Sequence, residues 1–318
     1  MSSAKEPIYI GIDLAWGEKN PSGFCVTTPA KNKLKILELK LLYTIEEILQ
    51  AVQKYKEHKV YVGIDAPLVV PNEDGNREIE KAFNKDFCTY KISMLPVNKK
   101  ILRMYSPTLR SLSLFEKLSE LGFCRDYKSN KVVFEVYPHA TIAMLWNQHQ
   151  ILPYKRKKGR NTQFIKEQLQ TYKKYLLKVF SSHAILKQDP VDLKGKKLKE
   201  YEDLLDSLTS AYTIYYAHFN EVKFYQLEAK DTFVTPISLW KVYVLKCSDD
   251  TLYTGIATDL VRRLDEHNNS SKGAKYTRVR RPVELVYFEN VLDRVEASKR
   301  EYAIKKMSRK EKLELINV

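Results

Sequence analysis

Residues 241–264 read KVYVLKCSDDTLYTGIATDLVRRL, and this stretch decides how the last quarter of the chain folds. Its opening valines, tyrosine and leucine favour a β-strand, because β-branched and aromatic residues fit a pleated sheet. A Ser-Asp-Asp turn follows, and a second strand ends at Gly255. Thr258 or Asp259 then suits the cap of a helix. The stretch therefore predicts a strand, a turn, a strand and a helix.

The same stretch resembles the GIY-YIG nuclease family. Val242-Tyr243-Val244 stands where that family has its GIY motif, and Tyr253-Thr254-Gly255 stands where it has YIG. Further elements follow at suitable spacing: Arg262-Arg263-Leu264, His267-Asn268, Gly273-Ala274-Lys275-Tyr276-Thr277 and Ser298-Lys299-Arg300-Glu301-Tyr302. The pattern covers nearly all of residues 240–315 and is most similar to the small YhbQ-like branch, with UvrC and junction-resolving endonucleases as further likenesses. The first glycine of GIY is absent, a departure that removes no catalytic group.

The resemblance implies a metal-dependent phosphodiesterase. Such a reaction needs an activated water, a counter-charge for the phosphate and help for the leaving oxygen. By resemblance, Tyr243 or Tyr253 activates the water and Glu301 holds a single divalent metal, Mg²⁺ or Mn²⁺. Arg263 steadies the phosphate, since a guanidinium donates two parallel hydrogen bonds. His267 contacts the phosphate or assists proton transfer, although it equally fits a helix-capping role. The catalytic residues implied are Tyr243, Tyr253, Arg263, His267 and Glu301.

Helical spacing alone also predicts where the Glu301 side chain lies. Ala297, Glu301 and Ile304 recur at i, i+4 and i+7, so the three side chains are expected to face the sheet. A carboxylate in an apolar stripe is costly unless it is paired or bound to a metal. The alternative partner is Lys305, four residues further on.

A repeated tripeptide marks the first part of the chain: Gly11-Ile12-Asp13 is echoed by Gly63-Ile64-Asp65. If the predicted strands 8–13 and 60–65 are parallel neighbours, both aspartates emerge at one sheet edge. Glu135, in a predicted strand over 131–137, and Asp203 or Asp206, on a predicted helix over 199–219, are expected to converge there. Taken singly, each aspartate equally fits a turn at a strand end.

Clustered carboxylates repel one another and call for a cation. Oxygen ligands without nitrogen or sulfur favour Mg²⁺ or Mn²⁺ over zinc. The candidate ligands of this second metal site are Asp13, Asp65, Glu135 and Asp206.

The predicted order of elements supports a fold for this part of the chain. Strands over 8–13, 23–28 and 34–43, a helix over 45–58 and a strand over 60–65 give β-β-β-α-β, the order of the RNase H-like fold. The string also resembles the family called domain of unknown function 429, described as a predicted RNase H-like nuclease. The matching segments, within about residues 8–237, are Gly11–Trp16, Gly63–Leu68, Gly75–Arg77, Phe134–Pro138 and Asp203–Ala211.

The expected fold class is therefore α/β in two domains: an RNase H-like mixed sheet flanked by helices over 1–237, and a small α/β GIY-YIG domain over 238–318. Residues 71–131 read as a partly helical insertion. Residues 154–160 form a basic loop, followed by a predicted helix over 162–181. Residues 221–240 are expected to be a connector, with Thr235-Pro236 marking the boundary.

Composition agrees with a nucleic-acid partner. The 318 residues carry a formal net charge of +15, and both predicted domains are basic. Binding of Lys and Arg to phosphates releases counterions, so the surplus favours a polyanion, with DNA the expected one. Four cysteines without a CxxC pair indicate a reducing cytoplasm. No apolar run is long enough for a membrane span or a secretory signal. The sequence does not indicate an oligomeric state.

Three hypotheses follow. The first is an endonuclease whose C-terminal site is catalytic and whose N-terminal domain is a second nuclease or a substrate-positioning unit. The second is a non-catalytic protein that binds branched nucleic acid. The third is an actin-like ATPase fused to a nuclease, because Gly-Ile-Asp after a strand also occurs in that class. The third ranks last, since such ATPases need a glycine-rich phosphate loop and the chain has only ten glycines.

Overall fold

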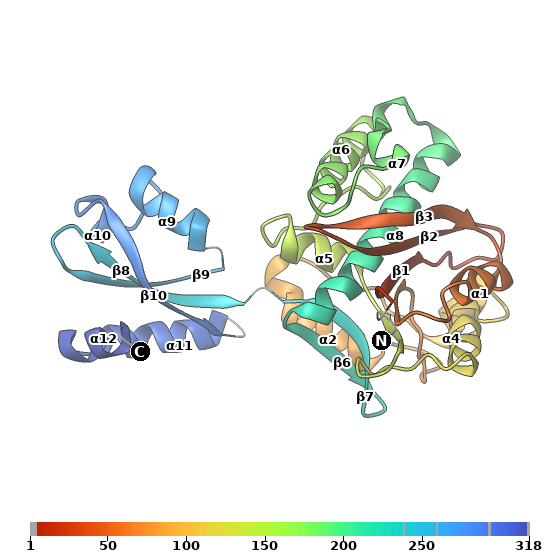
Figure 1. The fold of residues 1–318 in the computed structure, drawn as a ribbon, viewed down its shortest axis with the longest axis horizontal. Helices are drawn as coiled ribbons and strands as arrows, with labels where there is room; N and C mark the ends of the chain where they lie inside the picture. Colours follow the sequence, from red (N-terminus) through yellow and green to blue (C-terminus); the bar gives the residue numbers. More distant parts are fainter. Residues whose placement is uncertain (1–4, 238, 259, 292–293, 317–318) are drawn as a thin grey trace. The chain divides into compact units, whose positions relative to one another are not determined.

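The computed structural model describes residues 5–237, 239–258, 260–291 and 294–316 (Figure 1). The chain folds as two compact units, residues 1–236 and 237–318. The first unit has a seven-stranded mixed sheet and the second a three-stranded sheet, each with helices packed on it. The predicted fold class, a large mixed sheet with helices plus a small α/β unit, is confirmed. Among the described residues, no helix combines the length and apolar character that a bilayer span requires.

The sheet of the first unit has the strand order β3-β2-β1-β4-β5-β7-β6. Its first three strands form an antiparallel meander, and β4 and β5 then continue parallel to β1. The strands are β1 (Ile8–Asp13), β2 (Ser22–Ala30), β3 (Lys33–Leu42), β4 (Val60–Asp65), β5 (Lys131–Glu135), β6 (Val222–Leu227) and β7 (Lys230–Pro236).

Helices cover both faces of this sheet, and side chains of β1 alternate between them. Ile8, Ile10 and Ile12 pack with α1 and α4, whereas Tyr9 packs with α6 and α8. The helices are α1 (Ile45–Gln53), α2 (Glu78–Phe87), α3 (Lys99–Tyr105), α4 (Arg110–Glu120), α5 (Pro138–Leu145), α6 (Thr162–Val179), α7 (Ala184–Lys187) and α8 (Gly195–Phe219), with 3₁₀ turns at Cys88–Tyr90 and Pro190–Asp192.

Glycine lets α8 lie directly on the strands. A Cβ atom on Gly11 would stand 1.9 Å from the Ser207 carbonyl oxygen, and one on Gly63 would stand 2.6 Å from that of Ser210. Any larger residue would therefore push the helix off the sheet. The glycine of each Gly-Ile-Asp repeat permits this packing, which carries Asp206 of α8 to the ends of β1 and β4.

The structure corrects one predicted element. Residues 221–240, expected to be a connector, contain the antiparallel hairpin β6–β7 at the edge of the sheet. Its turn places Glu228 and Ala229 at φ of 53° and 57°. Glycine or asparagine usually occupies such positions, so the sequence carried no turn signal there. Other predicted boundaries also differ by a few residues; for example, the first helix ends at Gln53 and β5 ends at Glu135, after which Pro138 starts α5.

The second unit contains the predicted strand, turn, strand and helix. Its sheet has the order β10-β8-β9, with α9 packed on the face that carries Tyr243 and α11 on the face that carries Val242. Asp259, one of the two predicted caps, lies outside the described residues. The elements are β8 (Trp240–Cys247), β9 (Leu252–Ala257), α9 (Leu260–Asn269), α10 (Lys275–Arg278), β10 (Val283–Val291), α11 (Arg294–Lys306) and α12 (Arg309–Ile316).

Candidate functional site

Two motif tyrosines share one face of the small sheet. Tyr243 on β8 pairs with Gly255 on β9, and Tyr253 precedes Gly255 by two residues, which returns it to the same face. A Cβ atom on Gly255 would stand 2.5 Å from the Tyr243 hydroxyl oxygen, so the glycine makes room for that hydroxyl. Tyr243 is buried, whereas Tyr253 is half-buried, with the two ring centroids 6.4 Å apart.

A chain of hydrogen bonds runs through His267. The Tyr243 hydroxyl lies 2.9 Å from His267 Nε2, and His267 Nδ1 lies 2.7 Å from Thr277 Oγ1. Arg263 Nε donates to the Tyr243 hydroxyl at 3.3 Å, and the Thr277 hydroxyl donates to the Ala274 carbonyl at 3.0 Å. These directions require Tyr243 to donate to His267 Nε2 and Nδ1 to carry the imidazole proton. The arrangement therefore sets the tautomer of His267.

Burial keeps the side chains of His267 and Tyr243 neutral. It lowers the pKa of His267 to about 4 and raises the pKa of Tyr243 to about 12. The His267 side chain is fully buried, so it offers no surface to a phosphate group. The hydrogen bond to a neutral imidazole holds the Tyr243 hydroxyl in position, an arrangement that the sequence did not indicate.

Arg263 on α9 links these hydrogen-bonded side chains to the protein surface. Its Nη1 atom donates to Glu266 Oε2 at 2.8 Å and to the Lys272 carbonyl at 3.2 Å. The side chain is 24% exposed, so a phosphate can reach part of the guanidinium. Because Nε is held by Tyr243, the planar group has a defined orientation.

Glu301 belongs to α11, on the other face of the sheet. Ala297 and Ile304 are fully buried against Val242 and Val244, as the helical stripe predicted. Glu301 itself is 21% exposed and pairs with Lys305 Nζ at 2.7 Å, the alternative partner. Burial raises the pKa of Tyr243, and the Glu301 charge adds a smaller contribution in the same direction.

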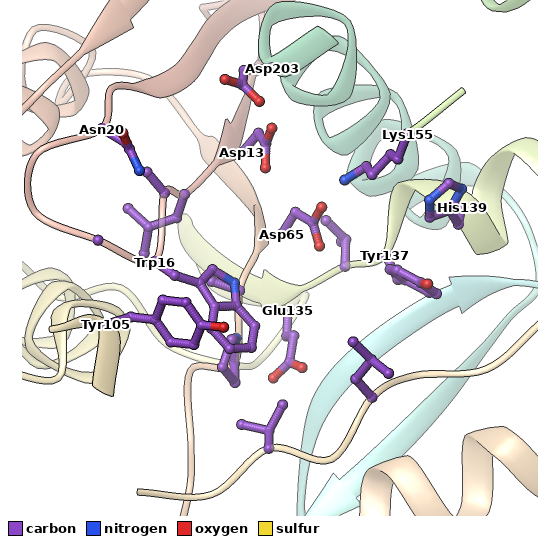
Figure 2. Close-up of a pocket in the computed structure, with 18 of the residues that line it drawn as sticks. Asp13, Trp16, Asn20, Asp65, Tyr105, Glu135, Tyr137, His139, Lys155 and Asp203 are labelled. Carbon is purple, nitrogen blue, oxygen red and sulfur yellow. The ribbon is translucent and has the colours of Figure 1, made fainter. Parts of the chain in front are cut away.

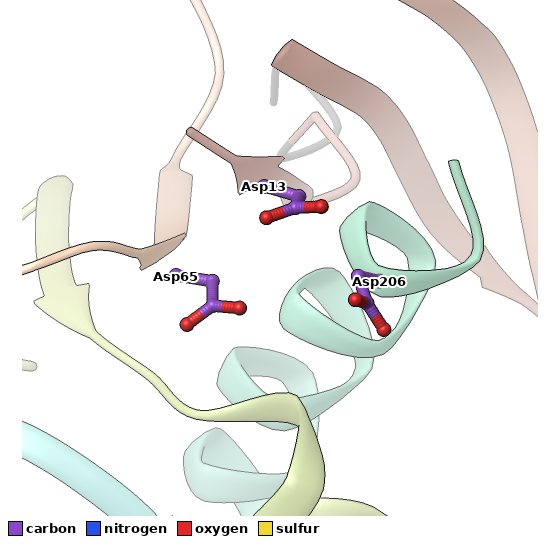
Figure 3. A group of neighbouring side chains, drawn as sticks. All are labelled: Asp13, Asp65 and Asp206. Carbon is purple, nitrogen blue, oxygen red and sulfur yellow. The ribbon is translucent and has the colours of Figure 1, made fainter. Parts of the chain in front are cut away.

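Three aspartates meet at one edge of the large sheet (Figure 3). Asp13 and Asp65 are opposite each other at the ends of β1 and β4, as the repeated tripeptide predicted. Asp206 comes from α8, and one oxygen atom from each carboxylate lies within 4.8 Å of the others. Parallel strands and a glycine-seated helix thus bring together residues 193 positions apart at most.

Opposing influences set the charges of this aspartate cluster. Burial raises the pKa of Asp13 well above its usual range and that of Asp65 to about 7, while Lys155 opposes both shifts. Burial alone would also raise the pKa of Asp206, but Lys155 and the Tyr154 hydroxyl hold it below the ordinary value. Lys155 Nζ is 3.0 Å from Asp206 Oδ2, and Tyr154 donates to Oδ1 at 2.7 Å.

Sequence reasoning missed Lys155 as a site residue. It belongs to the basic loop 154–160, where a charge run is ordinarily a solvated surface. Figure 2 shows its amine directed towards Asp13 and Asp65. His139 was missed as well, since nothing in Tyr137-Pro138-His139 distinguishes a site residue from a helix start.

Glu135 stands apart from the aspartate cluster. Its two carboxylate oxygens accept from Arg77 Nη1 and Nη2 at 2.9 and 2.6 Å, and the Leu68 amide donates to it at 3.2 Å. Arg77 also pairs with Glu80 at 2.6 Å, all three side chains being buried. Glu135, predicted as a fourth ligand, is therefore not one of the three clustered carboxylates, and its two oxygens are held by a guanidinium instead. Asp203, the alternative to Asp206, pairs with Lys199 Nζ at 2.6 Å.

The aspartate cluster has the chemistry of a hard-cation site. Its donors are all carboxylate oxygens, the ligands that Mg²⁺ and Mn²⁺ prefer. Asp206 is buried, and its two carboxylate oxygens contact the Tyr154 hydroxyl and Lys155 Nζ.

The fold and the motif residues define a protein with a GIY-YIG catalytic domain, the family that matches residues 239–314. The chain belongs to the family described as "Protein of unknown function (DUF429)", which matches residues 11–228. Both resemblances drawn from the sequence are thereby confirmed.

Relatives of the C-terminal region carry the name UPF0213 protein. One from Desulfotalea psychrophila is 61% identical over 77 residues, which is 24% of this chain and 70% of the relative. One from Staphylococcus epidermidis is 56% identical over 75 residues, 24% of this chain and 90% of the relative. The solution NMR structure of a UPF0213 protein from Bacillus halodurans is 43% identical in sequence. The aligned region covers 25% of this chain and 83% of that protein, with a TM-score of 0.18.

Proposed function

We propose that this protein is a metal-dependent endonuclease that hydrolyses phosphodiester bonds in nucleic acid, with DNA as the expected substrate. The hydrogen-bonded arrangement of Arg263, Tyr243 and His267 in a matching GIY-YIG domain carries the proposal. All four cysteines are free, which agrees with action in the cytoplasm.

Exposure separates the roles of the two tyrosines. Tyr253 is the half-buried one, so we assign it to the attacking water. Buried Tyr243 donates a hydrogen bond to His267 and accepts one from Arg263, and thereby orients the guanidinium. Arg263 binds the phosphate and stabilises the charge that develops on it. Glu301 would hold the divalent ion, whose chemistry here is that of a Lewis acid at a phosphate oxygen.

The decisive test is cleavage by Glu301→Gln. The full chain is incubated with Mg²⁺ or Mn²⁺ and with junction, flap, hybrid and single-stranded substrates. We expect Glu301→Gln to lose nearly all cleavage while it folds and binds normally, because the amide cannot replace a charged ligand. Glu314→Gln, at an exposed glutamate of α12, is the matched control.

If the Glu301→Gln variant cleaves at the same rate as the wild-type protein, the assignment of Glu301 as the metal ligand is wrong. Tight binding without cleavage of any substrate by the wild-type protein would instead favour the non-catalytic alternative.

We further propose that the first unit binds Mg²⁺ or Mn²⁺ at Asp13, Asp65 and Asp206. It would act on the same nucleic acid, as a second nuclease or as a unit that positions the substrate. The closeness of the three carboxylates carries this proposal. The order β3-β2-β1-β4-β5, with its antiparallel meander and parallel continuation, agrees with an RNase H-like fold.

Thermal unfolding tests this metal centre. In full-length protein carrying Glu301→Gln, Mn²⁺ is expected to raise the Tm of the first unit, since a ligand that binds only the folded state stabilises it. At about 100 times Kd, the gain is about 2.7 kcal/mol. Asp13→Asn is expected to remove the response, and Asp74→Asn, at an exposed aspartate, to keep it. Equal responses of the Asp13 and Asp74 variants would contradict the assignment.

A further inference from the structure

A cavity of about 660 Å³ opens beside the aspartate cluster (Figure 2). Its volume falls within the roughly 300–1,000 Å³ of small-molecule sites. Figure 2 shows Asp13 and Asp65 towards one end of it and Trp16 and Tyr105 towards the other, and all four residues line it. The cavity therefore joins a charged end to an aromatic end, and each end restricts what the cavity can hold.

The aromatic end has two large rings open to solvent. Trp16, three residues after β1, and Tyr105, the last residue of α3, meet edge to face with centroids 5.2 Å apart. Trp16 is 36% exposed and Tyr105 is 56% exposed. Aromatic rings at a cavity wall with free surface suit a planar ligand that can stack on them.

The charged end has cationic groups and an unsatisfied imidazole. Lys155 and Lys199 line the cavity with their ammonium groups close to the aspartates. His139 also lines it, and its Nδ1 atom has no hydrogen-bond partner among the described residues, although the side chain is only 8% exposed. A buried nitrogen without a partner indicates a polar group that the bound ligand supplies.

We propose that this cavity binds one nucleotide of a single-stranded or locally unpaired nucleic acid, with its base stacked on the Trp16 ring and its edge against the perpendicular Tyr105 ring. Its phosphate lies towards the aspartate cluster, Lys155 and His139. The inference rests on the proposed function of the first unit and names its substrate class. A nucleotide supplies both required parts, a planar ring and an anion that a cation at the carboxylates can bind.

The cavity also restricts the form of the nucleic acid. A base inside a duplex is stacked between its neighbours, so it must be unpaired or turned out before it can enter a pocket. Stacking accepts every base, since each has a flat π-face. The first unit is therefore expected to prefer unpaired strands without reading their sequence.

Tryptophan fluorescence tests the site without requiring cleavage. Full-length Glu301→Gln protein with Mn²⁺ is titrated with thymidine tetranucleotide, thymidine monophosphate and ribose 5-phosphate. We expect saturable quenching by the tetranucleotide, weaker binding of the monophosphate and no quenching by the sugar phosphate, which has no base. Trp16→Leu is expected to remove the quenching, which assigns it to Trp16 among the three tryptophans.

Tyr105→Leu keeps the Trp16 reporter and is expected to weaken tetranucleotide binding about tenfold, the effect of losing one stacking ring. Tyr43→Leu, at an exposed tyrosine outside the cavity, is the control that is expected to bind normally. Full quenching in Trp16→Leu, or equal affinities of the Tyr105 and Tyr43 variants, would overturn the base site.

Equal affinity for the monophosphate and the tetranucleotide would overturn the assignment to a strand and leave a free nucleotide as the ligand. Failure of the proposed metal centre is recognised separately, because Asp13→Asn would then leave the Mn²⁺-dependent Tm unchanged. Quenching of Trp16 still decides the base site in that case.

Discussion

Tyr243 illustrates how single residues set the chemistry of the second unit. Its hydroxyl fits only because Gly255 opposite it lacks a side chain. Its hydroxyl donates a hydrogen bond to the neutral imidazole of His267 and accepts one from Arg263. The tyrosine therefore transmits the position of a buried imidazole to a guanidinium that solvent can reach.

Arg263→Ala is expected to lower kcat by about 10²–10³-fold, the usual effect of losing a donor that stabilises the transition state. Affinity should change less, because the phosphate contact strengthens as charge develops. Single-turnover cleavage and equilibrium binding measure the two quantities. The control is Arg262→Ala, the neighbouring arginine that also pairs with Glu266. A loss of affinity alone would make Arg263 a docking residue.

At the scale of elements, α8 and its contact with the sheet build the aspartate cluster. Gly11, Gly23 and Gly63 allow backbone contact between the strands and the helix. The parallel pairing of β1 and β4 then aligns Asp13 with Asp65, and α8 adds Asp206. Metal affinity and helix packing should consequently be lost together.

Gly11→Ala tests this link. The new methyl group would stand 1.9 Å from the Ser207 carbonyl oxygen and 2.4 Å from the Ala211 amide nitrogen, so α8 must shift. We expect a loss of about 1–3 kcal/mol or more in the free energy of unfolding, together with weaker Mn²⁺ binding. Gly17→Ala is the control, because its nearest atoms lie at 3.7 Å or beyond. Denaturant unfolding and metal titration give the two readouts, and unchanged values for Gly11→Ala would refute the close packing.

At the scale of the whole molecule, each of the two units has its own sheet and hydrophobic core. The candidate residues divide in the same way, with the aspartates and the cavity in the first unit and the GIY-YIG residues in the second. Among the described residues, the side chains named for each candidate site come from a single unit.

The two sites are therefore expected to fail independently. Asp13→Asn should remove the Mn²⁺-dependent rise in Tm and retain cleavage of a short substrate by the second unit. Glu301→Gln should remove the cleavage and retain the Mn²⁺-dependent rise in Tm. Both variants are compared with the double variant by calorimetry and cleavage in parallel. Loss of cleavage in Asp13→Asn would show instead that the first unit takes part in the reaction on that substrate.

Features of this protein that depend on local pattern can be predicted from the amino-acid sequence. The strands of the Gly-Ile-Asp repeats, the strand–turn–strand–helix of residues 241–264 and the buried stripe of Ala297 and Ile304 all follow from periodicity and turn chemistry. Parallel pairing of two similar strands also predicts that Asp13 and Asp65 share an edge. For these residues, neighbours in sequence or a simple repeat supply the necessary information.

The pairing of charged side chains, in contrast, depends on the folded chain. Glu135 pairs with Arg77, whereas Lys155, from a loop that reads as solvated surface, reaches the aspartates. The burial of His267 could not be predicted from the sequence either. The hairpin β6–β7 could not be predicted because its turn lacks glycine. Ion pairs and burial depend on segments far apart in the chain, and their energies are set by distance and desolvation in the folded state, which residue spacing does not record.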